Sequence, residues 1–184
     1  NLHLVLPEIF LSLSIMFLLM VGVFKKKSEN LVYNLSIITL VVLLALVVKL
    51  FSINETYIFN ESYKIDNLSS FMKSLTIISA IFVMISSSTY LRKLKILKIE
   101  YPILILSSIL GMMVMISSND LIVFYLGLEL QSLALYVLAS FNRDNILSSE
   151  SGLKYFVLSA LSSGLLLYGC SLVYGFSGST NFNL

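Results

Sequence analysis

Residues 119–141 read NDLIVFYLGLELQSLALYVLASF, an almost unbroken apolar run that opens with a polar turn. A helix needs about 20 apolar residues to cross a bilayer, because each residue advances about 1.5 Å. Asp120 is well suited to cap the N-terminus of such a helix. The run therefore predicts a transmembrane helix, and its most unusual residue is the glutamate near its middle, Glu129.

The rest of the chain has the same character. Of the 184 residues, 58% are hydrophobic and 12% are charged, whereas a soluble domain has about 25% charged residues. We predict an all-α integral membrane protein with about six transmembrane helices. Besides 120–141, the predicted spans are 4–24, 31–50, 67–91, 101–118 and 150–175. The sixth is predicted to start at Ser148-Ser149-Glu150, which resembles a turn followed by an N-cap.

Basic residues are concentrated in alternate connections between these spans. Eight of them lie on one side: Lys25, Lys26, Lys27, Arg92, Lys93, Lys95, Lys98 and Arg143. The opposite connections hold Lys64 beside three carboxylates. Cytoplasmic or matrix-side loops carry such an excess of positive charge. The basic side is therefore predicted to face inward, and both ends of the chain to face outward.

Glu129 lies too deep in its span to reach either surface easily. Tyr125 precedes it, and Ser132 and Tyr136 follow it, all at helical spacing, which predicts a polar stripe on one helix face. Burial raises the pKa of a carboxyl group and a nearby cation lowers it, so such a group can take up and release protons. The alternative is a protonated glutamic acid that only forms hydrogen bonds between helices.

Charged residues within the spans are functional candidates by default. Lys49, at the end of its span, is expected to snorkel, which leaves Lys73, Lys154 and Glu8 to consider beside Glu129. Lys73 is expected either to take part in transport or to form a structural pair or snorkel. Lys154 lies near the inner end of the sixth span. The sequence is equally consistent with a role in the proton path and with a side chain that snorkels to the membrane surface. Glu8 is interpreted as a helix-start residue near the outer surface.

Nothing in the sequence predicts a redox centre. His3 has no partner at a metal-ligand spacing, and the single cysteine, Cys170, excludes an internal disulfide. The small net charge of +2 argues against nucleic acid as a partner, and membrane lipids are expected instead. Ala160 and Gly164 have the spacing of a close helix-packing motif. We predict that the chain binds no metal and no cofactor.

Two long blocks carry a family resemblance. Residues 119–141 and the run from Glu150, ESGLKYFVLSALSSGLLLYGCSLVYGFSGSTNF, closely resemble the antiporter-like subunit 2 of respiratory complex I, called subunit N in bacteria. Weaker matches are LPEIFL from Leu6 and DNLSSFMKSL from Asp66. The resemblance covers essentially the whole chain.

The resemblance implies a role in proton translocation coupled to the oxidation of NADH by ubiquinone. It implies that Glu129 and Lys154 take part in proton translocation, and Lys73 matches the family by its context. Tyr125, Ser132 and Tyr136 are expected to support the same proton path because of their spacing. NADH, FMN, iron–sulfur clusters and ubiquinone are expected elsewhere in the complex. The other membrane-arm subunits are the expected partners.

Family members continue with further helices, arranged as inverted repeats. We expect a split subunit, with a separate polypeptide supplying the remaining helices. Residues 1–100 are expected to hold three N-terminal helices and a basic inner loop, and residues 101–184 the start of the first repeat. The bias towards Lys, Ile, Asn and Tyr is typical of AT-rich genomes. It favours the mitochondrial inner membrane, with the bacterial plasma membrane as the alternative.

Two other functions remain open on the sequence alone. One is a subunit of a related cation/proton antiporter or membrane hydrogenase. The other is a structural membrane-arm fragment without its own proton path.

Overall fold

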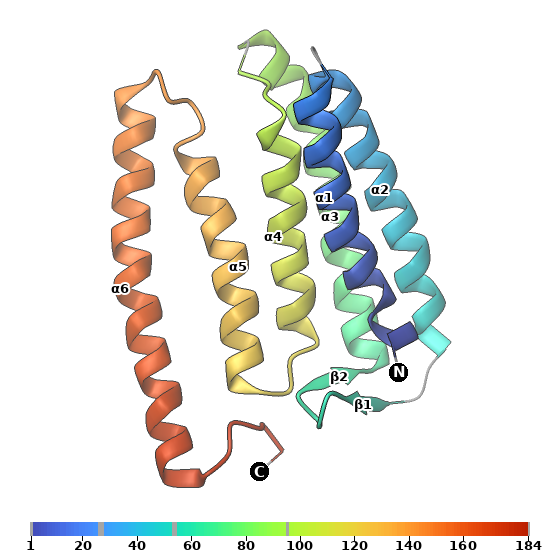
Figure 1. The fold of residues 1–184 in the computed structure, drawn as a ribbon, viewed down its shortest axis with the longest axis vertical. Helices are drawn as coiled ribbons and strands as arrows, with labels where there is room; N and C mark the ends of the chain where they lie inside the picture. Colours follow the sequence, from blue (N-terminus) through green and yellow to red (C-terminus); the bar gives the residue numbers. More distant parts are fainter. Residues whose placement is uncertain (1, 26–27, 53–54, 95, 184) are drawn as a thin grey trace.

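The computed structural model describes residues 2–25, 28–52, 55–94 and 96–183. Six long helices run roughly side by side along the molecule (Figure 1). In chain order, the elements are η1 (Leu2–Val5), α1 (Leu6–Phe24), α2 (Glu29–Lys49), η2 (Leu50–Ser52), β1 (Thr56–Ile58), β2 (Tyr63–Ile65), α3 (Asn67–Lys93), α4 (Glu100–Ile116), α5 (Leu121–Ala139) and α6 (Ile146–Ser177).

The predicted all-α membrane fold is confirmed. Within the described residues, five helices are long and apolar enough to cross a membrane, and α4, with 17 residues, is shorter. Asp120 caps α5 as predicted, because its carboxylate accepts a hydrogen bond from the backbone N–H of Ile122. The predicted start of the sixth span is wrong: α6 begins at Ile146, where the Asn145 side chain accepts from the N–H of Leu147.

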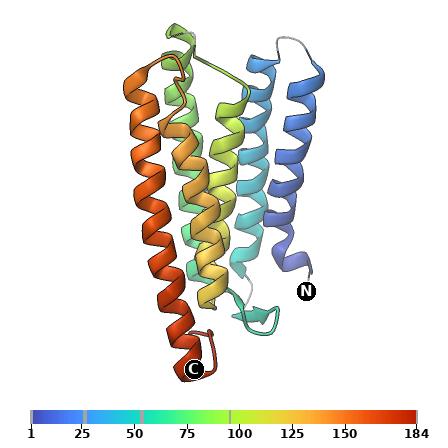
Figure 2. The ribbon, with the colours of Figure 1, turned by 60° about the vertical axis from the view of Figure 1, so that its left-hand side comes forward.

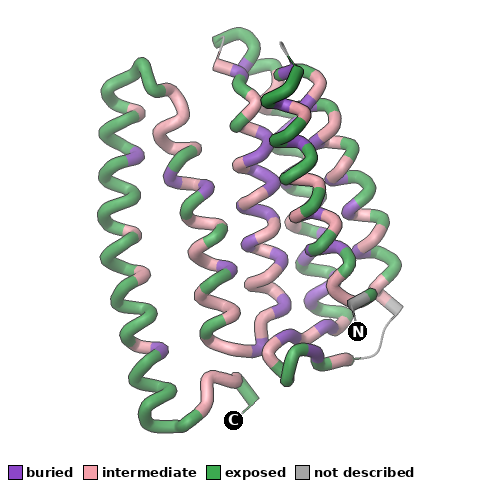
Figure 3. The backbone as a smooth tube through the Cα atoms, in the orientation of Figure 1, coloured by how far each residue is buried: buried purple, intermediate pink, exposed green. Residues whose placement is uncertain are grey.

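The first four helices form the main apolar core. Leu11, Leu40, Met84, Leu106 and Met113 are among its fully buried side chains. Many large apolar side chains also point outward, as expected of helices whose outer surface faces lipid. In the burial-coloured view the buried positions gather between α1, α2, α3 and α4, whereas α6 is exposed over most of its length (Figure 3).

Glycines bring α4 and α5 into backbone contact. A Cβ atom built on Gly111 would lie 2.7 Å from the carbonyl oxygen of Gly127, and one built on Gly127 would lie 2.8 Å from the backbone nitrogen of Met115. Gly152 of α6 makes a similar approach to Ser140, at 2.4 Å from its Cβ atom. A Cβ atom on Gly164, by contrast, would meet nothing within 4 Å, so the packing predicted around Ala160 and Gly164 is not formed among the described residues.

A β-hairpin, which hydropathy did not predict, covers one end of the bundle. Its strands pair in an antiparallel register, with Thr56 opposite Ile65. The turn between them uses three residues with positive φ angles, Phe59, Asn60 and Glu61. Strand β2 continues its pairing with the turn before α5, since the N–H of Lys64 donates to the carbonyl of Ser117 at 2.8 Å.

Asn119 joins this hairpin to the segment that follows α6. Its side-chain amide donates to the carbonyl oxygen of Glu61 at 2.8 Å and to Oδ1 of Asn181 at 3.1 Å. The N–H of Leu121 also donates to the carbonyl of Thr180. Hairpin, α4–α5 turn and C-terminal segment therefore lie together at the end of the bundle opposite the basic connections (Figures 1 and 2).

Candidate functional site

Glu129 is the ninth residue of α5 and lies near the middle of that helix. Its side chain is half-buried, and its Oε1 atom is buried without a hydrogen-bond partner among the described residues. A buried polar atom without a partner costs about 1–3 kcal/mol. Such an atom is usually satisfied by water, a ligand or another chain, so Glu129 is placed to interact with something beyond these residues.

Two residues of the polar stripe predicted on α5, Ser132 and Tyr136, lie on the side that faces α6. Tyr136 is buried and packs edge to face against Tyr155 and Phe156 of α6, with ring centroids 4.9 and 5.8 Å away. Ser132 is half-buried and lines the same side of the helix. Tyr125 lies one turn before Glu129 and is also half-buried.

The hydroxyl groups of this stripe do not form a direct chain to the carboxylate. Ser132 Oγ donates to the backbone carbonyl of Leu128 in its own helix, and Ser140 Oγ lies 3.3 Å from the carbonyl of Tyr136. Serines within helices commonly bond in this way. Proton transfer along this face would therefore require water molecules between the side chains.

A cavity of about 380 Å³, the central cavity, provides space for such water between α5 and α6. Its polar lining consists of Gln131, Ser132, Tyr136, Tyr155, Ser159, Ser162 and Ser163. A cavity with several hydrogen-bonding groups can hold ordered water, whereas an apolar one of equal size stays dry. The sequence indicated the α5 half of this lining, but not the serines that α6 contributes.

Lys154 does not contact Glu129 within the described residues. Its ammonium group lies 2.5 Å from Oε1 of Glu150, one turn earlier in α6, and its side chain is 67% exposed. An exposed pair of this kind contributes only about 0.3–0.5 kcal/mol. The ammonium group therefore remains free to exchange partners.

Lys73 belongs to a different, fully buried cluster. Its Nζ atom donates to Oε1 of Glu8 at 2.6 Å and to the phenol oxygen of Tyr63 at 3.2 Å. Tyr63 donates to the same Glu8 oxygen at 2.8 Å. Burial raises the pKa of Tyr63 above its usual range and the Glu8 carboxylate raises it further, so Tyr63 stays a hydrogen-bond donor.

Glu8 lies in the first turn of α1, as predicted, but it also belongs to this buried cluster, which the sequence did not indicate. Its side chain is only 6% exposed, because the hairpin that carries Tyr63 covers the outer end of α1 and α3. The sequence could not predict this contact, because Glu8 and Lys73 are 65 positions apart. The one available signal was that two opposite charges, Glu8 and Lys73, lie within apolar spans, where a charge usually needs a partner.

Among the described residues, no group of three His, Cys, Asp or Glu side chains could hold a metal ion. The polar groups of α5 and α6 are carboxylate, amide, hydroxyl and ammonium, which are suited to binding and passing protons.

Comparison with known proteins first identifies the class of membrane protein to which this chain is similar. Residues 118–184 match the family described as "NADH:quinone oxidoreductase/Mrp antiporter, TM". The fold resembles a chain of respiratory complex I from Thermus thermophilus with bound aureothin, with a TM-score of 0.80 and 25% identity. That likeness covers 95% of this chain and 38% of the other. The class is thus that of the antiporter-like membrane subunits.

The more particular likeness is to two bacterial relatives, both named NADH-quinone oxidoreductase subunit N. The protein from Pelagibacter ubique is 68% identical over 184 residues, which are 100% of this chain and 39% of the relative. The protein from Maricaulis maris is 51% identical, over 99% of this chain and 38% of the relative. Along its whole length the chain is similar to these subunit N proteins, and it corresponds to their N-terminal part. It spans about two fifths of their length.

Proposed function

We propose that this chain is part of the membrane arm of an NADH:quinone oxidoreductase and contributes to proton translocation through Glu129. The observation that carries the proposal is the carboxylate of Glu129, whose Oε1 atom is buried in the middle of a transmembrane helix and has no hydrogen-bond partner in the part of the chain that the structure describes. A carboxyl group in such a position has a proton affinity that responds strongly to a neighbouring cation. It can therefore be loaded and discharged when that cation moves.

Lys154 is the one basic residue of α6. We propose that it leaves its exposed pair with Glu150 during the cycle and contributes to the proton path of α5 and α6. Ser132, Tyr125 and Tyr136 support this path by holding water rather than by direct contact with Glu129. Lys73, held by Glu8 and Tyr63, has a structural role in this proposal.

The redox reaction belongs to other subunits in this proposal. NADH, FMN, iron–sulfur clusters and the quinone, ubiquinone or a related one, would be bound there, and this chain would supply proton movement alone. Its partners would be the other membrane-arm subunits and the remaining part of subunit N. Residues 1–100 would form an N-terminal unit, and residues 101–184 would begin the antiporter-like repeat.

The relatives are bacterial, which supports the bacterial plasma membrane as the location. They give no support to the mitochondrial inner membrane favoured by the composition. The family match is shared with Mrp antiporters, but the relatives with 68% and 51% identity are both named subunit N. We therefore prefer the oxidoreductase to a cation/proton antiporter.

Replacing Glu129 with Gln tests the role of the carboxylate. The amide has nearly the same shape but cannot take up a proton, so we expect the assembled complex to lose proton pumping per NADH oxidised. Pumping is measured by quenching of a pH-sensitive dye in inside-out membrane vesicles, with assembly followed on native gels. The matched control is Glu150→Gln, whose carboxylate is exposed on α6.

Normal pumping and NADH oxidation by an assembled Glu129→Gln variant would contradict the proposal. In that case the structural interpretation, a helical segment that seals the membrane arm, would be correct.

A further inference from the structure

Two cavities meet at one aromatic residue. Besides the central cavity, a cavity of about 550 Å³ lies at the basic end of the bundle, between the ends of α4, α5 and α6; we term it the inner cavity. Among the residues that line the two cavities, Tyr136 is the one that they share. It therefore forms the wall between them.

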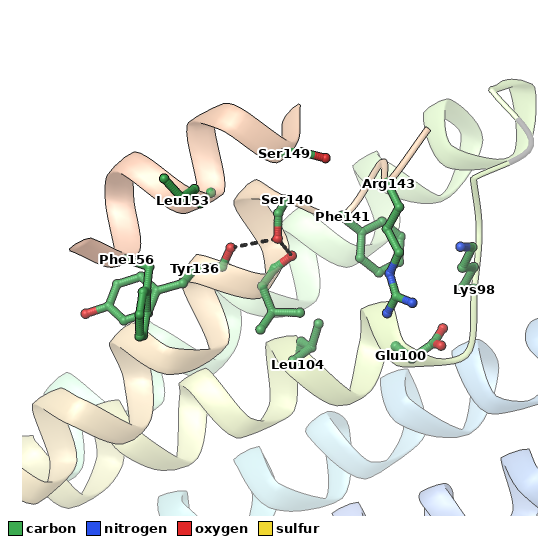
Figure 4. A pocket seen from close by; sticks show the side chains of 12 residues that line it. Lys98, Glu100, Leu104, Tyr136, Ser140, Phe141, Arg143, Ser149, Leu153 and Phe156 are labelled. Atoms are coloured by element: carbon green, nitrogen blue, oxygen red, sulfur yellow. Dashed lines mark hydrogen bonds between the residues drawn. The ribbon is translucent and has the colours of Figure 1, made fainter. Parts of the chain in front are cut away.

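The inner cavity is charged at one end and aromatic at the other. Figure 4 shows the side chains of Lys98, Glu100 and Arg143 on one side and those of Tyr136 and Phe156 on the other. The charged residues lie at the basic end of the bundle, where water has access. The aromatic end leads towards the central cavity, so water entering from the basic end meets the ring of Tyr136.

The ring of Tyr136 is held on both sides. Tyr155, which lines the central cavity, packs against it at an interplanar angle of 78°. Phe156, which lines the inner cavity, packs against it at 77°. Tyr136 itself is only 7% exposed. Edge-to-face contacts of this kind add about 0.5–1.5 kcal/mol each to the burial of the rings, so the wall is stable but can be opened by rotating one side chain.

We propose that Tyr136 is a gate that controls the access of water and protons from the basic end to the central cavity. In its observed position the ring keeps the two cavities apart, and its rotation joins them into one polar path. The role depends on the bulk of the ring and differs from a relay through the phenol hydroxyl. The inference rests on the proposed function, but it concerns access, which can be measured without pumping.

The test measures access by cysteine labelling in the complete complex, in membrane vesicles. Ser140→Cys reports on the inner cavity and Ser162→Cys on the central cavity. A membrane-impermeant methanethiosulfonate reagent is applied from the basic side, and the modified peptides are quantified by mass spectrometry. We expect rapid labelling at position 140 and slow labelling at position 162. Adding Tyr136→Ala should speed labelling at position 162 about tenfold or more, equivalent to a barrier lowered by about 1.4 kcal/mol.

Two further variants serve as controls. One separates the effect of the Tyr136 ring from that of its hydroxyl, and the other tests whether any large-to-small change in α5 speeds labelling. Tyr136→Phe keeps the ring and should leave position 162 slow to react. Leu133→Ala removes an exposed side chain of the same helix and should also leave it slow. If Tyr136→Ala fails to assemble, Tyr155→Ala removes the ring that packs against Tyr136 in the central cavity, which frees Tyr136 to rotate and should give the same increase.

Equal labelling rates at positions 140 and 162 in the presence of Tyr136 would overturn the proposal. Slow labelling at position 162 after removal of either ring would also overturn it. Both results are independent of Glu129: a gate can be present in a chain that does not pump, and pumping through Glu129 can occur without this gate. Proton leakage through resting vesicles gives a second readout, expected for Tyr136→Ala and not for Leu133→Ala.

Discussion

The ammonium nitrogen of Lys73 lies 2.6 Å from Oε1 of Glu8, and both side chains are almost completely buried. The pair joins α1 to α3, and the hydroxyl of Tyr63 joins both to the hairpin. A buried ion pair adds little stability compared with apolar residues of the same size. Loss of either partner is costly, however, because the other charge is then left buried without compensation. The pair therefore fixes how these three elements fit together.

Removing one partner should be far more damaging than removing both. We expect Glu8→Gln or Lys73→Met to destabilise the N-terminal bundle by about 3–5 kcal/mol, because one charged or polar group is left buried without its partner. The double variant Glu8→Leu/Lys73→Met should recover most of this loss. The yield of assembled complex and its thermal midpoint measure the effect. Lys49→Met, which removes an exposed lysine at the end of α2, serves as control.

A double variant as unstable as the single ones would show that the charge pair is not what holds the three elements together.

The two partners in the pair on α6 should differ in their effect on pumping. Lys154→Met removes the proposed proton-path cation, whereas Glu150→Gln removes only its exposed partner, one turn away. Since exposed pairs contribute about 0.3–0.5 kcal/mol, neither change should affect assembly. We expect lower proton pumping for Lys154→Met and normal pumping for Glu150→Gln. Equal pumping in the two variants would show that Lys154 is not part of the proton path.

The glycine contact between α4 and α5 should tolerate no side chain. In Gly127→Ala the new methyl group would lie within 3 Å of backbone atoms of α4. Backbone atoms cannot move aside as a flexible side chain can, so we expect a loss of about 1–3 kcal/mol from overpacking. The thermal midpoint of the complex measures this loss. Gly164→Ala is the matched control, because its methyl group meets nothing within 4 Å in this chain.

Unchanged stability of Gly127→Ala would mean that the two helices are farther apart in the assembled complex.

The start of α3 should depend on the charge of Asp66. Burial raises the pKa of Asp66, but hydrogen bonds from Ser69 and Lys64 outweigh this effect and lower it below its usual value. The stabilisation is therefore complete above the ordinary pKa of about 3.9 and is lost as the pH falls through the lowered pKa. Asp66→Ala removes the N-cap and should cost about 0.5–2 kcal/mol.

Asp66→Asn should cost less, since its amide oxygen can still accept from the N–H of Ser69. Hydrogen exchange of the first-turn amides of α3 at neutral pH compares the two variants. Exchange that is equally fast in both would show that the charge, rather than the cap, protects this turn.

The apolar spans could be predicted because membrane helices are recognised by length and hydropathy alone, and Asp120 could be recognised as a cap from local chemistry. Interactions between distant residues could not be predicted in this way. The Glu8–Lys73 pair depends on how α1 and α3 pack, and the hairpin strands are too short to show an alternating pattern. Small-residue spacing at Ala160 and Gly164 resembled a packing motif, whereas the close contacts use Gly111, Gly127 and Gly152.

Along α5, helical spacing placed Ser132 and Tyr136 on one face, and both line the central cavity; the wider stripe that includes Tyr125 and Glu129 stays a prediction. It did not predict that Ser132 donates to its own backbone, or that Tyr155 and Phe156 enclose Tyr136. Those features depend on which face α6 turns towards α5. Helix α6 carries serines along much of its length, so its sequence does not single out the face that packs on α5.

Helix α6 is fastened near its two ends. Close to one end Gly152 touches Ser140 and Ser148 donates to the carbonyl of Ala139, and beyond the other end Thr180 is held by Asp120 and Leu121. Over 32 residues the helix is about 48 Å long. A helix held at both ends cannot easily slide along its neighbour, and it bends most easily near its middle. A sideways push there would bend α6 while its end contacts stay intact.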